Sequence, residues 1–399
     1  MDSSDSHDPQ GARNGDSPLG TNQSGMRESN ERLVLTLLRR SSGLASAEIA
    51  RRTGLSAQTV SRLIRALEKD HLIRRGMPRR GRVGQPSVPI SLNPSGAYFL
   101  GLKVGRRSVE MVLTDFLGRI VDREKEIYHF PDFDRVLAFS LAASASIQSR
   151  LEPSSRPRIA GMGIAMPFHL WSWAEQIGVA PDRMANWRTK DLRAELAARI
   201  DLPLFLRNDA TAACSAELVF GTSPRPRNFL CFFVAFFIGG GLVLRGSLFT
   251  GSTGNAAGLG PLVVPDRDGR MVPLIELASL STLERQLAER GLDPMHIWDR
   301  ADGWDLPDDI LTGWIDGAGP ALAHAVKAAQ TLLDLDAILL DGWLPRPVLA
   351  DLTRRVAQAL DGLDLSGIRR PDILSGTIGA DARTLGAASL PLSARFLNE

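Results

Sequence analysis

Residues 46–67 read SAEIARRTGLSAQTVSRLIRAL and set the architecture of the amino-terminal part of the chain. Their apolar residues recur at helical spacing on both sides of Gly54, which predicts two helices joined by a tight turn. Ala50 is small enough for the two helices to approach closely, and Gly54 tolerates the left-handed turn conformation. With Val60 and Leu63 on the inner face of the second helix, the spacing fits a helix-turn-helix.

Capping residues predict where the helices of this unit begin. Ser46 is the expected cap of a helix over residues 47–53, and Ser56 is the expected cap of a helix from residue 57 to about Lys69. Leucines at helical spacing, followed by a Ser-Ser-Gly turn, predict a preceding helix over residues 30–40.

The outward face of the helix that begins at residue 57 carries side chains suited to DNA. If Val60 and Leu63 face inward, the polar residues near its start that face outward are Ser56, Gln58, Thr59, Ser61, Arg62 and Arg65. Gln can pair with adenine, Arg with guanine or a phosphate, and Ser or Thr with either. We therefore predict that this surface reads an operator. The alternative is a winged helix used for contact with protein.

Two β-prone segments follow, at residues 72–75 and 87–92, and predict the strands of a wing. The segment between them contains three arginines, Arg79, Arg80 and Arg82. These side chains are expected to lie along phosphates or to enter a narrow minor groove. The alternative is a flexible basic linker.

Charge is distributed unevenly along the 399 residues, although the net charge is only +2. Residues 25–94 hold 14 Lys and Arg against 5 Asp and Glu, a balance of +9. Residues 1–24 hold 1 against 4 (−3), and residues 95–399 hold 32 against 36 (−4). A basic module joined to a neutral-to-acidic body is typical of nucleic-acid binding, and a solvated basic face is the alternative.

Composition excludes several classes of protein. The longest apolar run, residues 229–238, is about half of the roughly 20 residues needed to cross a bilayer. Residues 1–24 are polar and lack the apolar core of a secretory signal, so we expect a disordered leader and a cytoplasmic protein without a membrane partner. Cys214 and Cys231 suggest neither a disulfide framework nor a zinc finger, and both are expected to be core thiols.

From residue 98 the sequence alternates between strand and helix patterns. Residues 99–105 and 108–115 predict paired strands, residues 135–151 a helix, and residues 159–165 a buried strand. Such alternation predicts an α/β domain of two lobes with a cleft between them.

Several short motifs occur in order along the chain. They are Gly-Arg-x-Gly-Gln-Pro at 81–86, Gly-Ile-Ala-Met-Pro at 163–167, Trp187, Asn-Asp-Ala at 208–210, Ile-Gly-Gly-Gly at 238–241, Glu-Leu-Ala-Ser at 276–279 and Ile-Gly-Ala-Asp-Ala-Arg-Thr-Leu-Gly-Ala at 378–387. Each motif is weak alone, but the ordered set is specific. With this set the chain resembles the ROK family (repressors, open reading frames and kinases).

The resemblance implies an α/β protein in which a winged helix-turn-helix precedes a two-lobed, actin-like and hexokinase-like (ribonuclease H-like) ATPase-fold domain. We expect residues 1–24 to form the leader, 25–94 the DNA-binding domain, 95–205 the first lobe and 206–399 the second lobe. The carboxyl-terminal helix is expected to return to the first lobe.

The segments that serve phosphates in catalytic members are altered here. An Asp-x-Gly-x-Thr loop for phosphates and magnesium matches Lys103-Val-Gly-Arg-Arg107, and a Gly-Thr-Gly-Ile-Gly-Gly-Gly loop matches Phe236-Phe-Ile-Gly-Gly-Gly241. A Gly-Gly-Gly on the nucleotide side matches Leu340-Asp-Gly-Trp343. Without the metal carboxylate and the glycine loops we expect no phosphoryl transfer and no cofactor. Residues 239–241 are expected to form a tight turn between two strands.

This sequence retains only some of the residues that contact the sugar in the family. Asn208 and Asp209 match the family pair that holds sugar hydroxyls, and Glu276 matches another sugar-contacting carboxylate, so the resemblance implies that these three residues bind an effector. The Glu and His of the family's Gly-Glu-x-Gly-His motif fall on Gly258 and Pro261. For Asp209, a helix N-cap is the alternative.

The family's structural zinc run matches residues 268–275, which contain no thiol or imidazole, so no metal is expected. The sequence therefore predicts a DNA-binding repressor of carbohydrate metabolism genes that binds a double-stranded operator and a sugar or sugar-derived effector. Symmetric half-sites imply at least a homodimer. The alternatives are a ROK sugar kinase with an appended DNA-binding domain and a constitutive regulator with a vestigial pocket.

Overall fold

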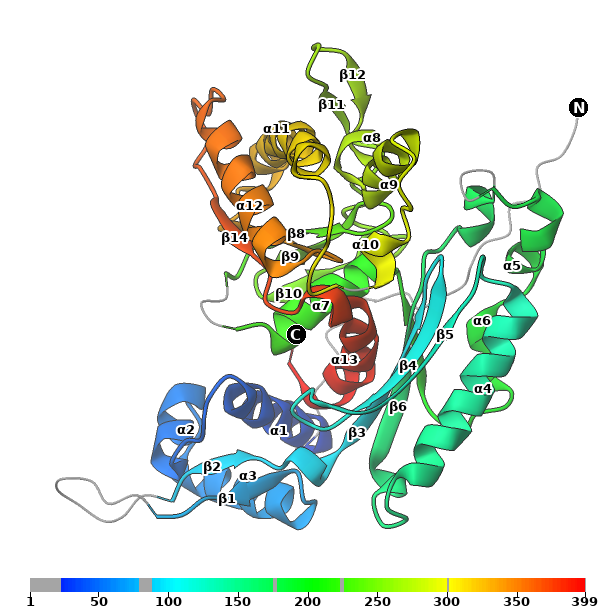
Figure 1. Ribbon diagram of the computed structural model, residues 1–399. Coiled ribbons are helices and arrows are strands. Elements are labelled where there is room, and N and C mark those ends of the chain that lie inside the picture. Colours follow the sequence, from blue (N-terminus) through cyan, green and yellow to red (C-terminus); the bar gives the residue numbers. More distant parts are fainter. Residues whose placement is uncertain (1–22, 79–87, 175–177, 223–225, 300, 399) are drawn as a thin grey trace, which may run out of the picture.

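The computed structural model describes residues 23–78, 88–174, 178–222, 226–299 and 301–398, and places a small amino-terminal unit beside two larger lobes (Figure 1). The small unit consists of α1 (Gln23–Arg39), α2 (Ser46–Thr53), α3 (Ala57–Lys69), β1 (Ile73–Arg75) and β2 (Ile90–Leu92). β1 and β2 pair antiparallel as the strands of the wing. Arg79, Arg80, Arg82 and residues 1–22 of the predicted leader lie outside the described residues, whereas residues 23 and 24, also assigned to the leader, belong to α1.

The helix-turn-helix prediction is confirmed. Gly54 follows α2 in the left-handed conformation (φ 72°), and Val60 and Leu63 are buried on the inner face of α3. Ser56 caps α3, because its hydroxyl accepts the backbone N–H of Thr59 at 3.1 Å. The predicted cap of α2 is wrong: Ser46 is the first residue of the helix, and Ala45, which has no side-chain acceptor, occupies the cap position.

The first lobe is built on a five-stranded sheet of order β5-β4-β3-β6-β7. Its strands are β3 (Tyr98–Val104), β4 (Ser108–Thr114), β5 (Ile120–Ile127), β6 (Ile159–Ala165) and β7 (Leu204–Arg207). One face is covered by α4 (Phe133–Arg150), α5 (Asn186–Thr189) and α6 (Leu192–Ala197), as Figure 1 shows. The predicted hairpin of β3 with β4 and the buried strand β6 are confirmed.

The second lobe repeats this plan with a sheet of order β10-β9-β8-β13-β14. Its strands are β8 (Phe229–Val234), β9 (Gly239–Leu244), β10 (Ser247–Phe249), β13 (Ala337–Gly342) and β14 (Asp372–Ser375). The outer layer comprises α8 (Leu274–Ala278), α9 (Leu280–Glu289), α10 (His296–Asp299), α11 (Asp308–Leu333) and α12 (Arg346–Asp361), with the hairpin β11 (Val263–Pro265) and β12 (Met271–Pro273).

Two helices, α7 (Asp209–Phe220) and α13 (Ala382–Phe396), lie between the two sheets (Figure 1). They pack so closely that a Cβ on Gly386 would overlap the backbone carbonyl of Ala212. α13 also packs on the first-lobe sheet, where Gly163 of β6 leaves room for the carbonyl of Ala387. Among the described residues, no helix has the length and apolar character needed to cross a membrane.

The expectation that residues 239–241 form a tight turn is wrong. All three glycines belong to β9 and pair with β8, and the turn is made by residues 235–238. The glycines are needed because α7 crosses this strand closely: a Cβ on Gly239 would lie 2.7 Å from the Cβ of Ala210, and one on Gly241 would overlap the side chain of Cys214. As expected, Cys214 and Cys231 are buried free thiols.

Candidate functional site

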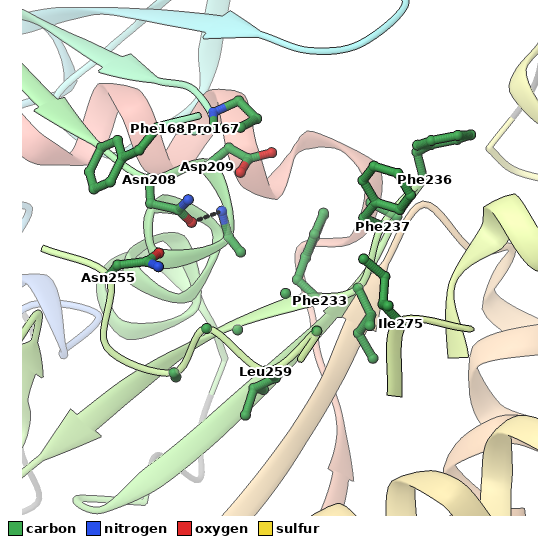
Figure 2. Close-up of a pocket in the computed structure, with 18 of the residues that line it drawn as sticks. Pro167, Phe168, Asn208, Asp209, Phe233, Phe236, Phe237, Asn255, Leu259 and Ile275 are labelled. Carbon is green, nitrogen blue, oxygen red and sulfur yellow. Dashed lines mark hydrogen bonds between the residues drawn. The ribbon is translucent and has the colours of Figure 1, made fainter. Parts of the chain in front are cut away.

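A cavity of about 330 Å³ lies between the two lobes (Figure 2). Its walls come from the segments that follow β6 and β7, from the turn between β8 and β9, and from residues 255–261. Single residues of other elements complete it: Arg106 after β3, Ile275 on α8 and Arg383 on α13. The cavity therefore draws on both lobes and on both central helices.

Asn208 and Asp209 project into this cavity from the start of α7 (Figure 2). The side-chain oxygen of Asn208 accepts the backbone N–H groups of Ala210 (3.0 Å) and Thr211 (3.4 Å), so Asn208 is the N-cap and its amide nitrogen can donate into the cavity. Asp209 is the first helical residue, and the N-cap alternative for it is therefore wrong. Its carboxylate lies 3.3 Å from the guanidinium of Arg383.

Glu276 is separated from this pair. It is exposed on α8, and its neighbour Ile275 faces the cavity instead. Gly258 and Pro261 line the cavity, so the positions of the family's Glu and His present neither a carboxylate nor an imidazole there. Asn255 contributes an amide nearby (Figure 2).

The sequence analysis missed five polar residues that line the cavity: Arg106, His169, Ser172, Asn255 and Arg383. Arg383 lies inside the quoted 378–387 motif, which was the available signal for it. Arg106 belongs to residues 103–107, which the resemblance identifies only as an altered phosphate loop. For His169 the sequence offers no signal, because no second histidine or carboxylate stands near it at a regular spacing.

The position of the kinase metal carboxylate is occupied by a buried ammonium. The Lys103 Nζ lies 3.1 Å from the Ser108 hydroxyl and 3.5 Å from the Glu110 carboxylate. Burial lowers the pKa of Lys103 to about 8. The carboxylate of Glu110 is also within 2.9 Å of Arg123, so it is already surrounded by cations. These residues do not fit a magnesium ion.

The position of the phosphate loop is filled by rings and a guanidinium. The Arg106 guanidinium lies 3.4 Å from the centre of the Phe236 ring and pairs with Glu284 of α9 at 3.4 Å. The indole N–H of Trp298 donates to the same carboxylate. Burial lowers the pKa of Arg106 to about 10. Because bulky groups stand where backbone would have to approach phosphate, the site does not fit a nucleotide.

The segment that matches the family's zinc run forms the end of the β11–β12 hairpin and the start of α8. The hairpin is closed by the Asp266 carboxylate, which accepts the backbone N–H groups of Asp268 (2.9 Å) and Arg270 (2.8 Å). Hydrogen bonds from the backbone to the Asp266 carboxylate thus hold this loop, and its residues do not fit a zinc ion.

On the amino-terminal unit, Gln58, Ser61, Arg62 and Arg65 are exposed on α3, and Thr59 is half-buried. The hydroxyls of Ser56 and Thr59 lie 2.9 Å apart and are engaged at the helix cap. Arg51 and Arg52 pair with Glu48, whereas Arg62 makes no ion pair with any described residue. The exposed face of α3 therefore presents a mixed polar and cationic surface.

The amino-terminal unit is joined to the lobes by a continuous apolar core. Leu38 of α1 belongs to the same buried cluster as Val219 of α7 and Phe396 of α13. Arg39 donates to the backbone carbonyl of Phe116, and its guanidinium lies 5.7 Å from the centre of the Phe220 ring. Both central helices that begin at the cavity therefore end against α1.

Comparisons with known proteins agree with this organisation. A model described as the ROK family matches residues 99–393, and one described as winged helix-turn-helix DNA-binding matches residues 27–74. The uncharacterized protein y4fQ of Sinorhizobium fredii is 26% identical over 375 residues, which cover 92% of this chain and 91% of that protein. The xylose repressor of Bacillus subtilis is 25% identical over 244 residues, which cover 61% of this chain and 62% of the repressor.

Two solved structures share the fold. A ROK family transcriptional regulator, described as a homologue of the Escherichia coli MLC protein, aligns with a TM-score of 0.67 at 21% identity and covers 93% of this chain and 97% of its own. A ROK family glucokinase from Streptomyces griseus in complex with glucose and AMPPNP aligns with a TM-score of 0.57 at 20% identity over 74% of this chain and 99% of its own. The glucokinase alignment leaves a quarter of this chain uncovered.

Proposed function

Because this chain belongs to the ROK family, we propose that it is a DNA-binding transcriptional repressor of carbohydrate metabolism genes, controlled by a sugar or sugar-derived effector that it binds without phosphorylating. In this proposal α3 reads an operator in double-stranded DNA through Gln58, Ser61, Arg62 and Arg65. Ser56 and Thr59 position the start of that helix, and the wing arginines Arg79, Arg80 and Arg82 contact the backbone or the minor groove.

The observation that carries the proposal is the pair of central helices. Asp209 and Arg383 stand at the cavity end of α7 and α13, and at their other end Phe220 and Asn398 contact α1. The two helices run parallel and stay in register along their length. Three contacts show this: the ion pair of Asp209 with Arg383, the packing of Gly386 on Ala212, and the hydroxyls of Ser215 and Ser389, which lie 2.8 Å apart. A parallel pair in fixed register can transmit a shift at the cavity to the DNA-binding unit.

The effector contacts in this proposal are Asn208 and Asp209, whose amide and carboxylate suit sugar hydroxyls. Glu276 would join them only if the lobes closed further, because it is exposed on α8. The xylose repressor relatives support a sugar as the ligand class. The absence of phosphoryl transfer is proposed from Lys103 and Arg106, which fill the positions of the metal carboxylate and the phosphate loop.

The same proposal keeps the division into a leader (1–24), a DNA-binding domain (25–94) and two lobes (95–205 and 206–399). A symmetric operator would require at least a homodimer. Lobe movement would then alter the spacing of two DNA-binding units, which requires that the effector prefer one of the two states.

The test begins with recovery of genomic fragments on the purified full-length protein. Fragments that bind with a steep dependence on salt are then challenged with a panel of monosaccharides and their substituted derivatives. The proposal predicts that at least one sugar releases them without any nucleotide. If only a sugar together with ATP has an effect, and phosphorylated sugar accumulates, the kinase alternative holds; if no sugar has any effect, the pocket is vestigial.

A further inference from the structure

The cavity between the lobes has a polar wall and an apolar wall that face each other. The polar wall carries Asn208, Asp209 and Asn255, with Pro167 and Phe168 beside them, and the apolar wall carries Phe236, Phe237 and Ile275 (Figure 2). The polar wall offers amides and a carboxylate, which suit hydroxyl groups. The apolar wall offers aromatic faces and an aliphatic chain, which cannot satisfy a hydroxyl.

The apolar wall is a built feature of the fold. The turn between β8 and β9 is fixed because the backbone N–H of Ile238 donates to the Ser279 hydroxyl at 3.0 Å. The rings of Phe236 and Phe237 lie against each other, with centres 4.5 Å apart. The Arg106 guanidinium covers Phe236 and is itself held by Glu284, so the position of the Phe236 ring is fixed by both lobes.

From this division we propose, within the proposed function, that the effector is a monosaccharide that carries an apolar substituent, such as an aryl glycoside or an ether. The sugar ring lies against Asn208 and Asp209, and the substituent lies against Phe237 and Ile275. A free sugar would leave the cavity faces of this wall in contact with water, whereas a substituent that covers apolar surface favours binding. The cavity volume of about 330 Å³ is at the lower end of the roughly 300–1,000 Å³ typical of sites for drug-sized ligands.

Paired ligands test this directly by isothermal titration calorimetry of the full-length protein. For each common aldose, the free sugar is compared with its 4-nitrophenyl glycoside and, for the hexoses, with its 6-O-benzyl ether. We expect one substituted member to bind at least about tenfold more tightly than the free sugar of the same configuration. 4-Nitrophenol alone is expected not to bind, because the polar wall would stay unsatisfied.

Variants locate the effect. Phe237→Ala and Ile275→Ala should each remove most of the preference for the substituted ligand, while Asp209→Asn should weaken both members of a pair by a similar factor. Phe249→Ala is the matched control, because Phe249 is an exposed ring on β10 outside the cavity. Unfolding temperatures of all four variants confirm that each is folded.

The outcomes separate the inference from the proposed function. Free sugars that bind as tightly as both of their substituted forms overturn the inference and leave a sugar-responsive regulator intact. A preference that survives both apolar-wall variants overturns the placement of the substituent. If no member of any pair binds, both the inference and the effector part of the proposed function are wrong.

Discussion

The Arg383 guanidinium lies 3.3 Å from the Asp209 carboxylate, and this ion pair joins the first turns of α13 and α7 at the edge of the cavity. The two side chains are only 13% and 16% exposed, so water screens their attraction weakly. A ligand hydroxyl that approached Asp209 would compete with Arg383 for the same carboxylate. Ligand binding would therefore act on the central helices first through this ion pair.

Gly386→Ala tests the packing of the central helices. The added methyl group would overlap the carbonyl of Ala212, and overpacking of a core costs about 1–3 kcal/mol. We expect the free energy of unfolding, measured with urea, to fall by that amount. Gly313→Ala is the control, because Gly313 is also helical but has open space around its Cα, and there alanine should be neutral or stabilising. Equal effects of the two substitutions would contradict the close packing described for α7 and α13.

Arg62→Ala and Arg65→Ala test the DNA-binding surface. Each should weaken operator binding by about 1–3 kcal/mol if it contacts a base edge, or reduce the salt dependence by about one ion if it contacts a phosphate. Fluorescence anisotropy at several salt concentrations distinguishes these cases. Arg290→Ala is a matched control, since Arg290 is an exposed arginine paired with Asp309 on the second lobe. Unchanged operator affinity in both α3 variants would show that this face of α3 is not the recognition surface.

The contact between the lobes through Arg106 and Glu284 can be measured by a double-mutant cycle. Both side chains are largely buried, and the guanidinium also stacks on Phe236, so we expect a coupling free energy of about 1–3 kcal/mol. The cycle for Arg270 and Asp268, an exposed pair at 3.7 Å, should give about 0–0.5 kcal/mol. If the two cycles gave the same small value, Arg106 would not hold the lobes together.

Asp341 should make stability depend on pH. Burial, and next the charge of Glu217, raise the pKa of Asp341 to about 7 from its ordinary value of 3.8. The folded protein then retains a proton that the unfolded chain loses near pH 4, so this group lowers the stability as the pH rises from about 4 to 7. Asp341→Asn removes that loss and keeps an oxygen to accept the Gly379 N–H.

The variant should therefore gain stability relative to the unmodified protein between pH 5 and 8, and the two should differ least near pH 4. Urea unfolding at four pH values measures this difference. Parallel stability profiles over the whole range would mean that Asp341 is ionised in the folded protein.

Local pattern was sufficient to predict the helix-turn-helix, since Gly54 and the apolar spacing of α3 are encoded within one short segment. It was also sufficient for the β3–β4 hairpin. β5 was not predicted, because this edge strand holds five charged residues in a row, 122–126, and carries little apolar signal. Residues 239–241 were assigned to a turn because the reason for those glycines, the close approach of α7, depends on tertiary packing.

The candidate site, too, could be predicted from the sequence only in part. Asn208 and Asp209 were both predicted as site residues, but sequence patterns do not fix the start of a helix to a single residue. In the structure Asn208, and not Asp209, is the N-cap of α7. Arg106 and Arg383 reach the cavity from segments far apart in the sequence, so no spacing could have joined them to Asp209. Glu276 matches the family motif in sequence. In the structure, however, the neighbouring residue Ile275, also in the first turn of α8, faces the cavity instead.

Release of operator DNA by a sugar in the absence of nucleotide tests the central claim most directly. A labelled operator duplex bound to the full-length protein is titrated with the sugar or glycoside that binds most tightly, with and without magnesium and ATP, while phosphorylated sugar is assayed in the same samples. We predict that the fluorescence anisotropy falls to the value of free duplex at the same ligand concentration in both series, and that no sugar phosphate forms. Release that requires ATP and is accompanied by sugar phosphate, or the lack of any salt-sensitive binding to DNA, would contradict the account.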